Sequence, residues 1–162
     1  LAMGDALAVA LLEARGFTAQ DFARSHPGGS LGRRLLLHVE DVMRRGDEVP
    51  RVGPATTLAD GLLEMSRKGL GMTVVVDADG RAVGVYTDGD LRRSLDKRLD
   101  VHAARMDEVM THPCKTIGAR ELAAEAVHLM EKHRINGLPV VDGDGRVVGA
   151  LNVHDLLRAG VV

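Results

Sequence analysis

The stretch at residues 26–34 gathers residue types that suit a phosphorylated ligand. Pro27 disfavours helical backbone at His26, so the histidine should begin a loop. That loop contains three glycines, which allow close backbone approach, and it ends in Arg33 and Arg34. It lacks the Gly-Lys-Thr ending of a P-loop, and a plain flexible connector fits its composition about equally well. On composition alone, the loop is a candidate phosphate contact and no more.

The Asp-x-Asp-Gly turn that starts at Asp142 resembles the beginning of a calcium-binding loop. Such a loop needs Gly at its sixth position and Glu at its twelfth, and these positions hold Val147 and Val153. A plain hairpin turn fits the stretch better. The histidines form no His-Glu-x-x-His or paired-cysteine pattern; they include His102, His112, His128, His133 and His154. We therefore expect no metal site and no bound cofactor.

Cys114 is the only cysteine, so it cannot form a disulfide within the chain. It lies in a Thr-His-Pro-Cys-Lys-Thr run that is typical of the entry to a strand, so we do not expect it to be a nucleophile. A single unpaired cysteine fits a reducing compartment. The sequence thus predicts a cytoplasmic protein.

The composition argues against nucleic acids and membranes as partners. The formal net charge is −2 and aromatic residues make up 2%, with no Trp, which leaves little for base stacking. No apolar run reaches the ~18 residues that a membrane span requires. The chain starts at Leu1, and the helix predicted for residues 1–15 is apolar around most of its circumference. We expect a piece of a longer protein in which this helix packs upstream, or else on the rest of the chain or a second copy.

The elements that must position any site come from an internal duplication. A hydrophobic strand, an Asp/Gly turn and a second hydrophobic strand occur at residues 75–84 and again at 140–149, a displacement of 65. Between residues 77–91 and 142–156, eight of fifteen positions are identical. Short amphipathic turns at residues 39–43 and 106–110 repeat at an offset of 67. Each repeat should therefore begin and end alike.

Hydrophobic periodicity predicts the same order in both repeats: strand, helix, strand, strand, helix. In the first repeat, Thr57 is placed to cap the first helix. The first repeat is predicted as a strand at 50–52, a helix at 58–68, strands at 72–76 and 81–87, and a helix from Asp88. The second is predicted as a strand at 116–117, a helix at about 120–133, a turn leading into a strand within 135–142, a strand at 146–152, and a helix from Val153.

This tandem unit, with the first copy ending in Gly-Val-Tyr-Thr-Asp-Gly-Asp at residues 84–90, resembles the CBS domain pair. The resemblance implies an α/β (α+β) fold with pseudo-two-fold symmetry, with CBS domains at residues 38–101 and 102–162. It also implies that Thr87 contacts phosphate and Asp90 accepts hydrogen bonds from ribose hydroxyls, in a cleft between the repeats. The chemistry fits, because a carboxylate can accept from two vicinal hydroxyls and a threonine beside a helix N-terminus can help to bind an anion.

The second copy of the motif reads Gly-Ala-Leu-Asn-Val-His-Asp at residues 149–155. Asp155 matches the family pattern, whereas Asn152 replaces the hydroxyl residue. We therefore rank the first site above the second. Helix capping without any ligand is the alternative for both aspartates.

The amino-terminal segment resembles the end of the sugar isomerase (SIS) domain of D-arabinose-5-phosphate isomerases, in which a CBS pair follows directly. The resemblance lies in residues 4–12 and in the Ser-His-Pro-Gly-Gly-x-Leu-Gly run at residues 25–32. It implies a SIS remnant at residues 1–37, with His26 as an active-site histidine suited to ring opening. The implied reaction interconverts ribulose 5-phosphate and arabinose 5-phosphate, toward the acid sugar Kdo of lipopolysaccharide. Since the family's other catalytic groups are absent, the 162-residue chain alone should be inactive.

The sequence therefore predicts a regulatory module that senses CMP-Kdo or an adenine nucleotide between the repeats. Four basic residues are expected to flank the cleft: Arg67, Lys68, Arg92 and Arg93. One alternative is a purely structural module that only self-associates. Another is a free-standing CBS-pair protein that serves a different enzyme. The family resemblance implies dimeric CBS pairs within a tetrameric parent.

Overall fold

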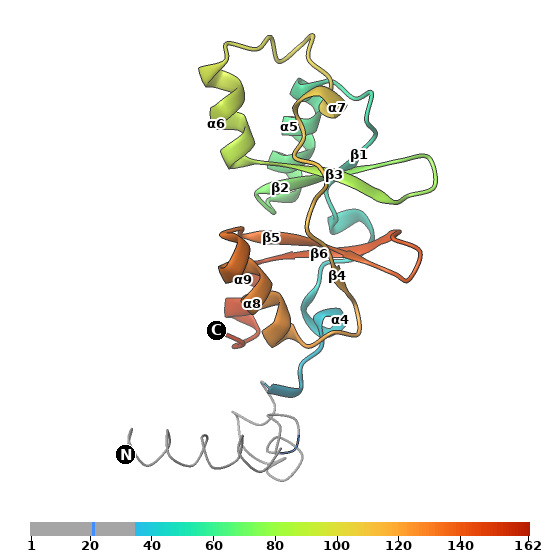
Figure 1. Ribbon diagram of the computed structural model, residues 1–162, viewed down its shortest axis with the longest axis vertical. Coiled ribbons are helices and arrows are strands. Elements are labelled where there is room, and N and C mark those ends of the chain that lie inside the picture. The colour runs from blue at the N-terminus through green and yellow to red at the C-terminus, as the bar shows by residue number, and fades with distance from the viewer. Residues whose placement is uncertain (1–20, 22–34) are drawn as a thin grey trace.

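The computed structural model describes Asp21 and residues 35–162 of the chain. Within this part, two repeats stack one above the other, each with a three-stranded sheet (Figure 1). The predictions for residues 1–20 and 22–34 lie outside the described residues. They include the amino-terminal helix, the glycine-rich loop and His26.

The first repeat has the predicted order, and its helix boundaries follow local capping. Thr57 caps α5 by accepting a hydrogen bond from the Asp60 amide at 3.2 Å, and Gly69 ends the helix with φ at +63°. In the sheet, β1 runs parallel to β2, and β2 runs antiparallel to β3. The elements are β1 (Arg51–Val52), α5 (Leu58–Lys68), β2 (Met72–Val76), β3 (Ala82–Thr87) and α6 (Asp88–Asp96).

The second repeat follows the same plan with the same strand order, β4-β5-β6. Its elements are β4 (Ile117–Gly118), α8 (Ala123–His133), β5 (Gly137–Val141), β6 (Val147–Asn152) and α9 (Val153–Arg158). The β-α-β-β-α repeats predicted from the sequence are thus confirmed.

The largest departure from the predicted boundaries is at α8, which begins three residues after the expected position near Arg120. The backbone before α8 accepts hydrogen bonds from residues 39–40, which are distant in sequence. Glu121 accepts a hydrogen bond from the Val39 amide at 2.8 Å, and Ala119 accepts one from Glu40 at 2.9 Å. These non-helical pairings delay the helix, and sequence periodicity cannot reveal them.

The short helices that introduce the repeats are exchanged between them. α4 (Val39–Val42) packs against α8 of the second repeat, whereas α7 (Met106–Val109) packs against α5 and β3 of the first. Figure 1 shows α4 in the lower half of the molecule and α7 in the upper half. A 3-10 turn, η1 (Gly46–Glu48), follows α4. The repeats are therefore tied together by more than a linker.

The two hairpin turns lie side by side on the edge of the molecule away from α6 and α9 (Figure 1). Gly80 and Gly145 adopt φ values of +80° and +81°, which favour glycine. The Ala82 amide donates to Gly145 O at 3.1 Å, and the Val147 amide donates to Gly80 O at 2.9 Å. This reciprocal pair of bonds expresses the pseudo-two-fold symmetry of the duplication.

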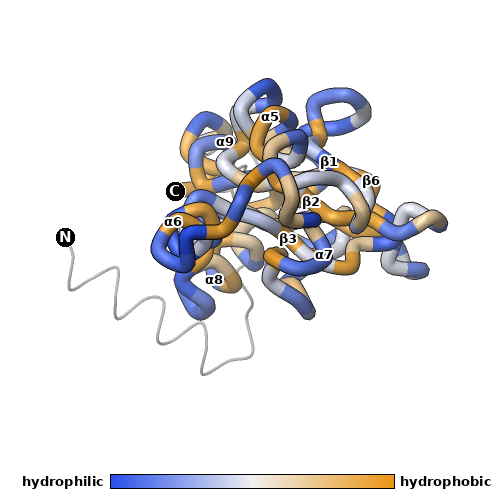
Figure 2. The backbone as a smooth tube through the Cα atoms, turned by 90° about the horizontal axis from the view of Figure 1, so that it is seen from above, coloured by the Kyte–Doolittle hydropathy of each residue, from blue (hydrophilic) through white to orange (hydrophobic). Residues whose placement is uncertain are grey.

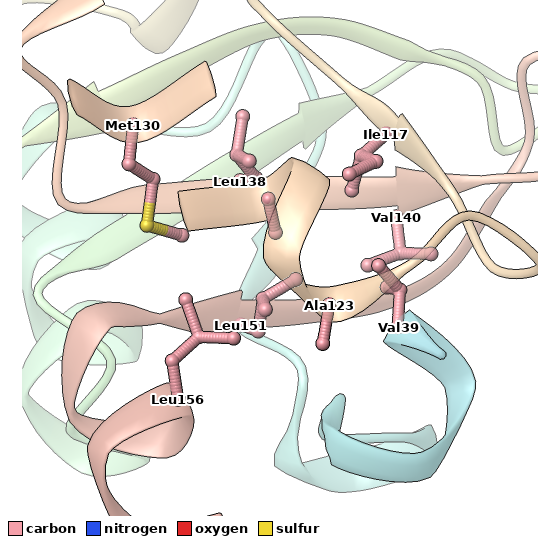
Figure 3. Packing of buried hydrophobic residues seen from close by; sticks show 9 residues of the cluster. Val39, Ile117, Ala123, Met130, Leu138, Val140, Leu151 and Leu156 are labelled. Atoms are coloured by element: carbon pink, nitrogen blue, oxygen red, sulfur yellow. The ribbon is translucent and has the colours of Figure 1, made fainter. Parts of the chain in front are cut away.

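Hydrophobic side chains fill each repeat and the space between them. In the second repeat, Met130 of α8 faces Leu138 of β5 and Leu156 of α9, and Val39 from α4 completes the cluster (Figure 3). A further cluster joins the sheets; it consists of Val49, Leu70, Met72, Val74, Val147 and Ala150. In Figure 2, hydrophobic stretches run along β2 and β6, and the surrounding loops are mostly hydrophilic. This shared core fixes the two repeats against one another.

Candidate ligand-binding cleft

A cavity of about 1030 Å³ lies between the repeats, on the side where α6 and α9 begin. This volume is near the upper end of the roughly 300–1,000 Å³ usual for small-molecule sites. The described lining residues fall within segments 69–72, 85–93, 111–115, 133–139 and 152–154. Because both repeats contribute walls, the cavity depends on their packing.

The cavity lining carries more positive than negative charge. Its described cationic residues are Arg92, Arg93, Lys115 and Arg134, and its acidic residues are Asp88 and Asp90. One of the acidic groups is already neutralised, since Arg93 Nη2 lies 2.5 Å from Asp90 Oδ1. The cleft is therefore locally positive in a chain of net charge −2, and it suits an anionic ligand.

Thr87 and Asp90 form a capping box at the start of α6. The Thr87 amide donates to Asp90 Oδ2 at 2.9 Å, and the Asp90 amide donates to Thr87 Oγ1 at 3.4 Å. The Thr87 hydroxyl also donates to Asp90 Oδ2 at 2.9 Å. Capping, the ligand-free role considered for these residues, is thus present. It also holds both side chains at the cavity wall beside the amides that begin α6.

The other carboxylate oxygen of Asp90 has partners that a ligand can replace. Asp90 Oδ1 accepts from Arg93 and, at 2.8 Å, from the hydroxyl of Thr111. The Arg93 side chain is 63% exposed, so its ion pair is weak and solvent-screened. A ligand hydroxyl can take the place of Arg93 at small cost and free that guanidinium for phosphate.

Tyr86 anchors α6 to the sheet beneath the cleft. Its side chain is fully buried, and its hydroxyl donates to Ser94 Oγ at 2.9 Å. Burial raises the pKa of Tyr86, so the hydroxyl stays protonated at neutral pH. This contact joins the end of β3 to the second turn of α6 and fixes the helix start that carries Asp90.

Apolar side chains from both repeats form the rest of the wall. They include Leu70, Met72, Val85, Ile135 and Pro139, with no Phe, Tyr or Trp among the described lining residues. Cys114 lies among them, and burial raises the pKa of its thiol, which keeps it neutral. A flat base or sugar ring would therefore contact aliphatic groups.

His133 adds a titratable group at the end of α8. Loss of solvent contact, followed by the positive charges of Lys115 and Lys132, lowers the pKa of His133 below its usual value. The imidazole is therefore mostly neutral at pH 7 in the unliganded cleft. A bound anion would favour its protonation.

In the second repeat, Asn152 occupies the position of Thr87 and also caps a helix. Its Oδ1 accepts from the Asp155 amide at 3.0 Å, and its Nδ2 donates to Leu70 O at 3.1 Å. Asn152 is buried at the cavity wall with both ends of its amide engaged. It therefore has less to offer a ligand than Thr87.

Asp155 is held by Arg44, which lies 111 residues earlier in the sequence. Arg44 Nε lies 3.2 Å from both carboxylate oxygens, and Nη2 lies 3.2 Å from Oδ1. The third nitrogen, Nη1, donates to Lys68 O at 2.9 Å. Asp155 is not among the described residues that line the cavity. Of the four residues predicted to bind ligand, the structure thus brings Thr87, Asp90 and Asn152 to one cavity.

The four basic residues expected beside the cleft divide into two groups. Arg92 and Arg93 line the cavity. Arg67 lines a separate hollow on α5 instead. The ammonium group of Lys68 contacts the Asp47 carbonyl and lies 3.8 Å from Glu64. Arg67 and Lys68 thus lie outside the described cavity lining, although they precede the lining residue Gly69 in sequence.

Sequence reasoning missed Thr111, Lys115, Arg134 and Arg44. Thr111 and Arg44 directly follow the amphipathic turns at offset 67, so aligning those turns one residue further would have paired them. Lys115 lies in a loop and Arg134 adopts a left-handed conformation after α8, with φ at +54°. Nothing in their local sequence marks these two as neighbours of the cleft.

Within residues 35–162 and Asp21, no group of three or more His, Cys, Asp or Glu side chains is arranged to hold a metal ion. In this same part of the chain, no helix combines the length and apolar character needed to cross a membrane.

The CBS domain model matches the chain at residues 39–97 and 106–162. The matched ranges coincide with the two structural repeats and their introductory helices. A solved structure of CBSX2 in complex with AMP is similar in fold, with a TM-score of 0.66 and 26% sequence identity. The match covers 77% of this chain and 96% of that one.

Arabinose 5-phosphate isomerases are similar to the whole of this chain. The protein named KdsD from Pseudomonas aeruginosa is 62% identical over 162 residues, and the one from Escherichia coli K12 is 54% identical. These alignments cover 100% of this chain but 50% and 49% of the relatives. The chain spans about half the length of the curated relatives it matches.

Proposed function

Because the chain belongs to the CBS domain family and encloses a cationic cleft between its repeats, we propose that it is a regulatory module for an anionic nucleotide or nucleotide sugar. The observation that carries this proposal is the placement of Thr87 and Asp90 at the start of α6, facing an excess of arginine and lysine. A hydroxyl-bearing anion satisfies both features.

In the proposed complex, the ribose hydroxyls donate to Asp90 in place of Arg93. The phosphate contacts the first amides of α6, the Thr87 hydroxyl and the nearby cations Arg92, Lys115 and Arg134. The base or second sugar packs on the aliphatic wall. CMP-Kdo and adenine nucleotides are the candidate ligands, and the AMP bound to CBSX2 supports the nucleotide class.

The parent enzyme is proposed to interconvert ribulose 5-phosphate and arabinose 5-phosphate on the way to Kdo, as the similarity to arabinose 5-phosphate isomerases suggests. His26, outside the described residues, is proposed to act there in ring opening, within a SIS segment at residues 1–37. Residues 38–101 and 102–162 form the two CBS domains of this assignment. The 162-residue chain alone is expected to be inactive.

Regulation requires that the ligand bind one arrangement of the catalytic subunits more tightly than another, since equal affinity shifts no equilibrium. A ligand that contacts both the first amides of α6 and the 133–139 segment touches both repeats, so it would stabilise one relative placement of the two. Inhibition by CMP-Kdo would make the cleft an end-product sensor.

Exposed leucines favour self-association as a second role. Leu63 of α5, Leu95 of α6 and Leu157 of α9 have exposed fractions of 57%, 59% and 51%. We propose these leucines as contacts with a second CBS pair. Dimeric pairs within a tetrameric parent are the proposed assembly, and a purely structural module would use this surface alone.

Calorimetric titration of the chain with CMP-Kdo, CMP, AMP and ATP tests the ligand-binding proposal. We expect saturable binding of at least one of them, and a loss of affinity of roughly 30-fold in Asp90→Asn, about 2 kcal/mol. Asn at this position keeps an oxygen for the Thr87 amide, so the cap survives.

Asp96→Ala, at the far end of α6, is the matched control and should bind like the wild-type chain. No heat from any of the four compounds would leave only the structural role. Sequencing upstream of Leu1 separates the isomerase parent from a free-standing CBS pair, because only the former has a SIS-encoding segment there.

A further inference from the structure

The second repeat contains a counterpart of the corner formed by Thr87, Asp90 and Thr111, and the cavity reaches only part of this counterpart: Asn152 lines the cavity, whereas Asp155 is not among its described lining residues. Asp155 corresponds to Asp90 and Lys68 to His133 at the displacement of 65, and Arg44 corresponds to Thr111 at the offset of 67. His133 and Thr111 line the cavity, whereas Lys68 and Arg44 are not among its described lining residues.

The backbones at these two corners are equivalent. The Thr111 amide donates to Val85 O at 2.8 Å, and Thr111 O accepts from the Val85 amide at 3.0 Å. Arg44 makes the same pair of bonds with Ala150, at 2.8 and 3.2 Å. Val85 and Ala150 are themselves 65 residues apart. The side chains at positions 111 and 44 therefore start from matching places relative to Asp90 and Asp155.

The two side chains fill these places to different extents. Thr111 gives Asp90 one hydroxyl donor and remains solvent-exposed. Arg44 gives Asp155 a three-bond clamp from Nε and Nη2, and its Nη1 extends on to Lys68 O. The Arg44 side chain is 18% exposed and that of Asp155 is 8% exposed. The guanidinium thus sits where a ligand's hydroxyl donors would have to sit.

We propose that the Arg44 side chain occupies the ligand position beside Asp155. The shorter side chain of Thr111 leaves the equivalent position beside Asp90 free for a ligand. The chain consequently takes one anionic ligand, bound at Asp90. This inference rests on the proposed nucleotide-binding function. It adds that the residue two positions after each introductory helix, Arg44 or Thr111, decides whether the corner beside it can receive ligand.

The reciprocal variant Thr111→Arg tests the rule in the corner that binds. It should place a guanidinium on Asp90 as Arg44 is placed on Asp155, and weaken binding of CMP and AMP at least 30-fold. Simple electrostatics predicts the opposite, because a further cation beside an anion site should tighten binding. Thr111 is exposed, so the longer side chain can be accommodated in the folded chain.

Thr111→Val is the matched control. It removes the hydroxyl bond to Asp90 but adds nothing that fills the corner, and should cost only a few-fold in affinity. Calorimetry should give one ligand per wild-type chain. Two ligands per chain, or a Thr111→Arg variant that binds as tightly as the wild type, would overturn the inference and leave the proposed function standing. If the wild-type chain bound none of the nucleotides, both this inference and the proposed function would be overturned.

Discussion

Asp90 and Asp155 occupy the same position in the two repeats, three residues after a helix N-cap, but their surroundings differ. Asp90 is held by an exposed arginine and two short hydroxyl side chains at the wall of a large cavity. Asp155 is clamped by a largely buried guanidinium from another part of the chain. The two repeats have the same backbone arrangement at this position. A few side chains decide that the Asp90 position is open to a ligand and the Asp155 position is filled.

The difference shows where a duplicated fold can specialise without loss of architecture. Each repeat has an exchanged introductory helix, a hairpin bonded to that of the other repeat, and a capping box at the start of its last helix. Stability and ligand binding therefore depend on different residues. Variants that separate the two properties can test this division.

The largest effect is expected from Arg44→Met. It leaves the buried carboxylate of Asp155 with only the exposed Arg158 as a charged partner, 3.4 Å away, and should lower the free energy of unfolding by about 3 kcal/mol. Arg93→Met removes the exposed ion-pair partner of Asp90 in the first repeat, and should cost no more than about 1 kcal/mol because Arg93 is exposed. Urea denaturation of the two variants measures both values; equal losses would contradict the contrast between the two corners.

A symmetric effect is expected where the repeats are structurally alike. A Cβ at Gly84 would lie 3.0 Å from Thr111 O and against Met110, and one at Gly149 would lie 2.8 Å from Arg44 O and against Met43. Replacing either glycine by alanine should destabilise the fold by about 2 kcal/mol, since the crossing backbone must shift. The same denaturation assay tests this. A large loss at one glycine and none at the other would show that the two crossings are not equivalent.

The smallest effect concerns pH. His133 has a lowered pKa in the empty cleft, and a bound anion should raise it, so binding takes up a proton. Affinity should therefore increase as pH falls toward and below about 6.5, by roughly two- to five-fold.

Calorimetry at several pH values, with the His133→Gln variant as reference, checks this. The comparison cancels protonation of the ligand's own phosphate. An identical pH dependence in both proteins would remove His133 from the binding site.

Much of the fold follows from local sequence. The hairpins, the order of strands and helices and the capping of α5 and α6 arise from turn residues, short runs of β-branched residues and Thr at helix starts. The predicted start of α8 was wrong because the backbone at residues 119–121 accepts hydrogen bonds from residues far away in the sequence. The exchange of α4 and α7 escaped prediction for the same reason.

The candidate site divides in a similar way. Thr87, Asp90, Arg92 and Arg93 are neighbours in sequence, and the motif that contains them pointed to the cleft. The clamp of Arg44 on Asp155 joins residues 111 positions apart, so only the folded chain reveals it. Sequence ranked the second site lower because Asn152 replaces a hydroxyl residue, and the structure adds the stronger physical reason.

A crystal structure of the 162-residue chain grown with saturating CMP tests the central claim most directly. We predict one nucleotide per chain, with its ribose hydroxyls on Asp90, its phosphate among Arg92, Lys115 and Arg134, and Arg44 still bound to Asp155. A nucleotide on Asp155 with Arg44 displaced, or equal occupation of both corners, would contradict the account.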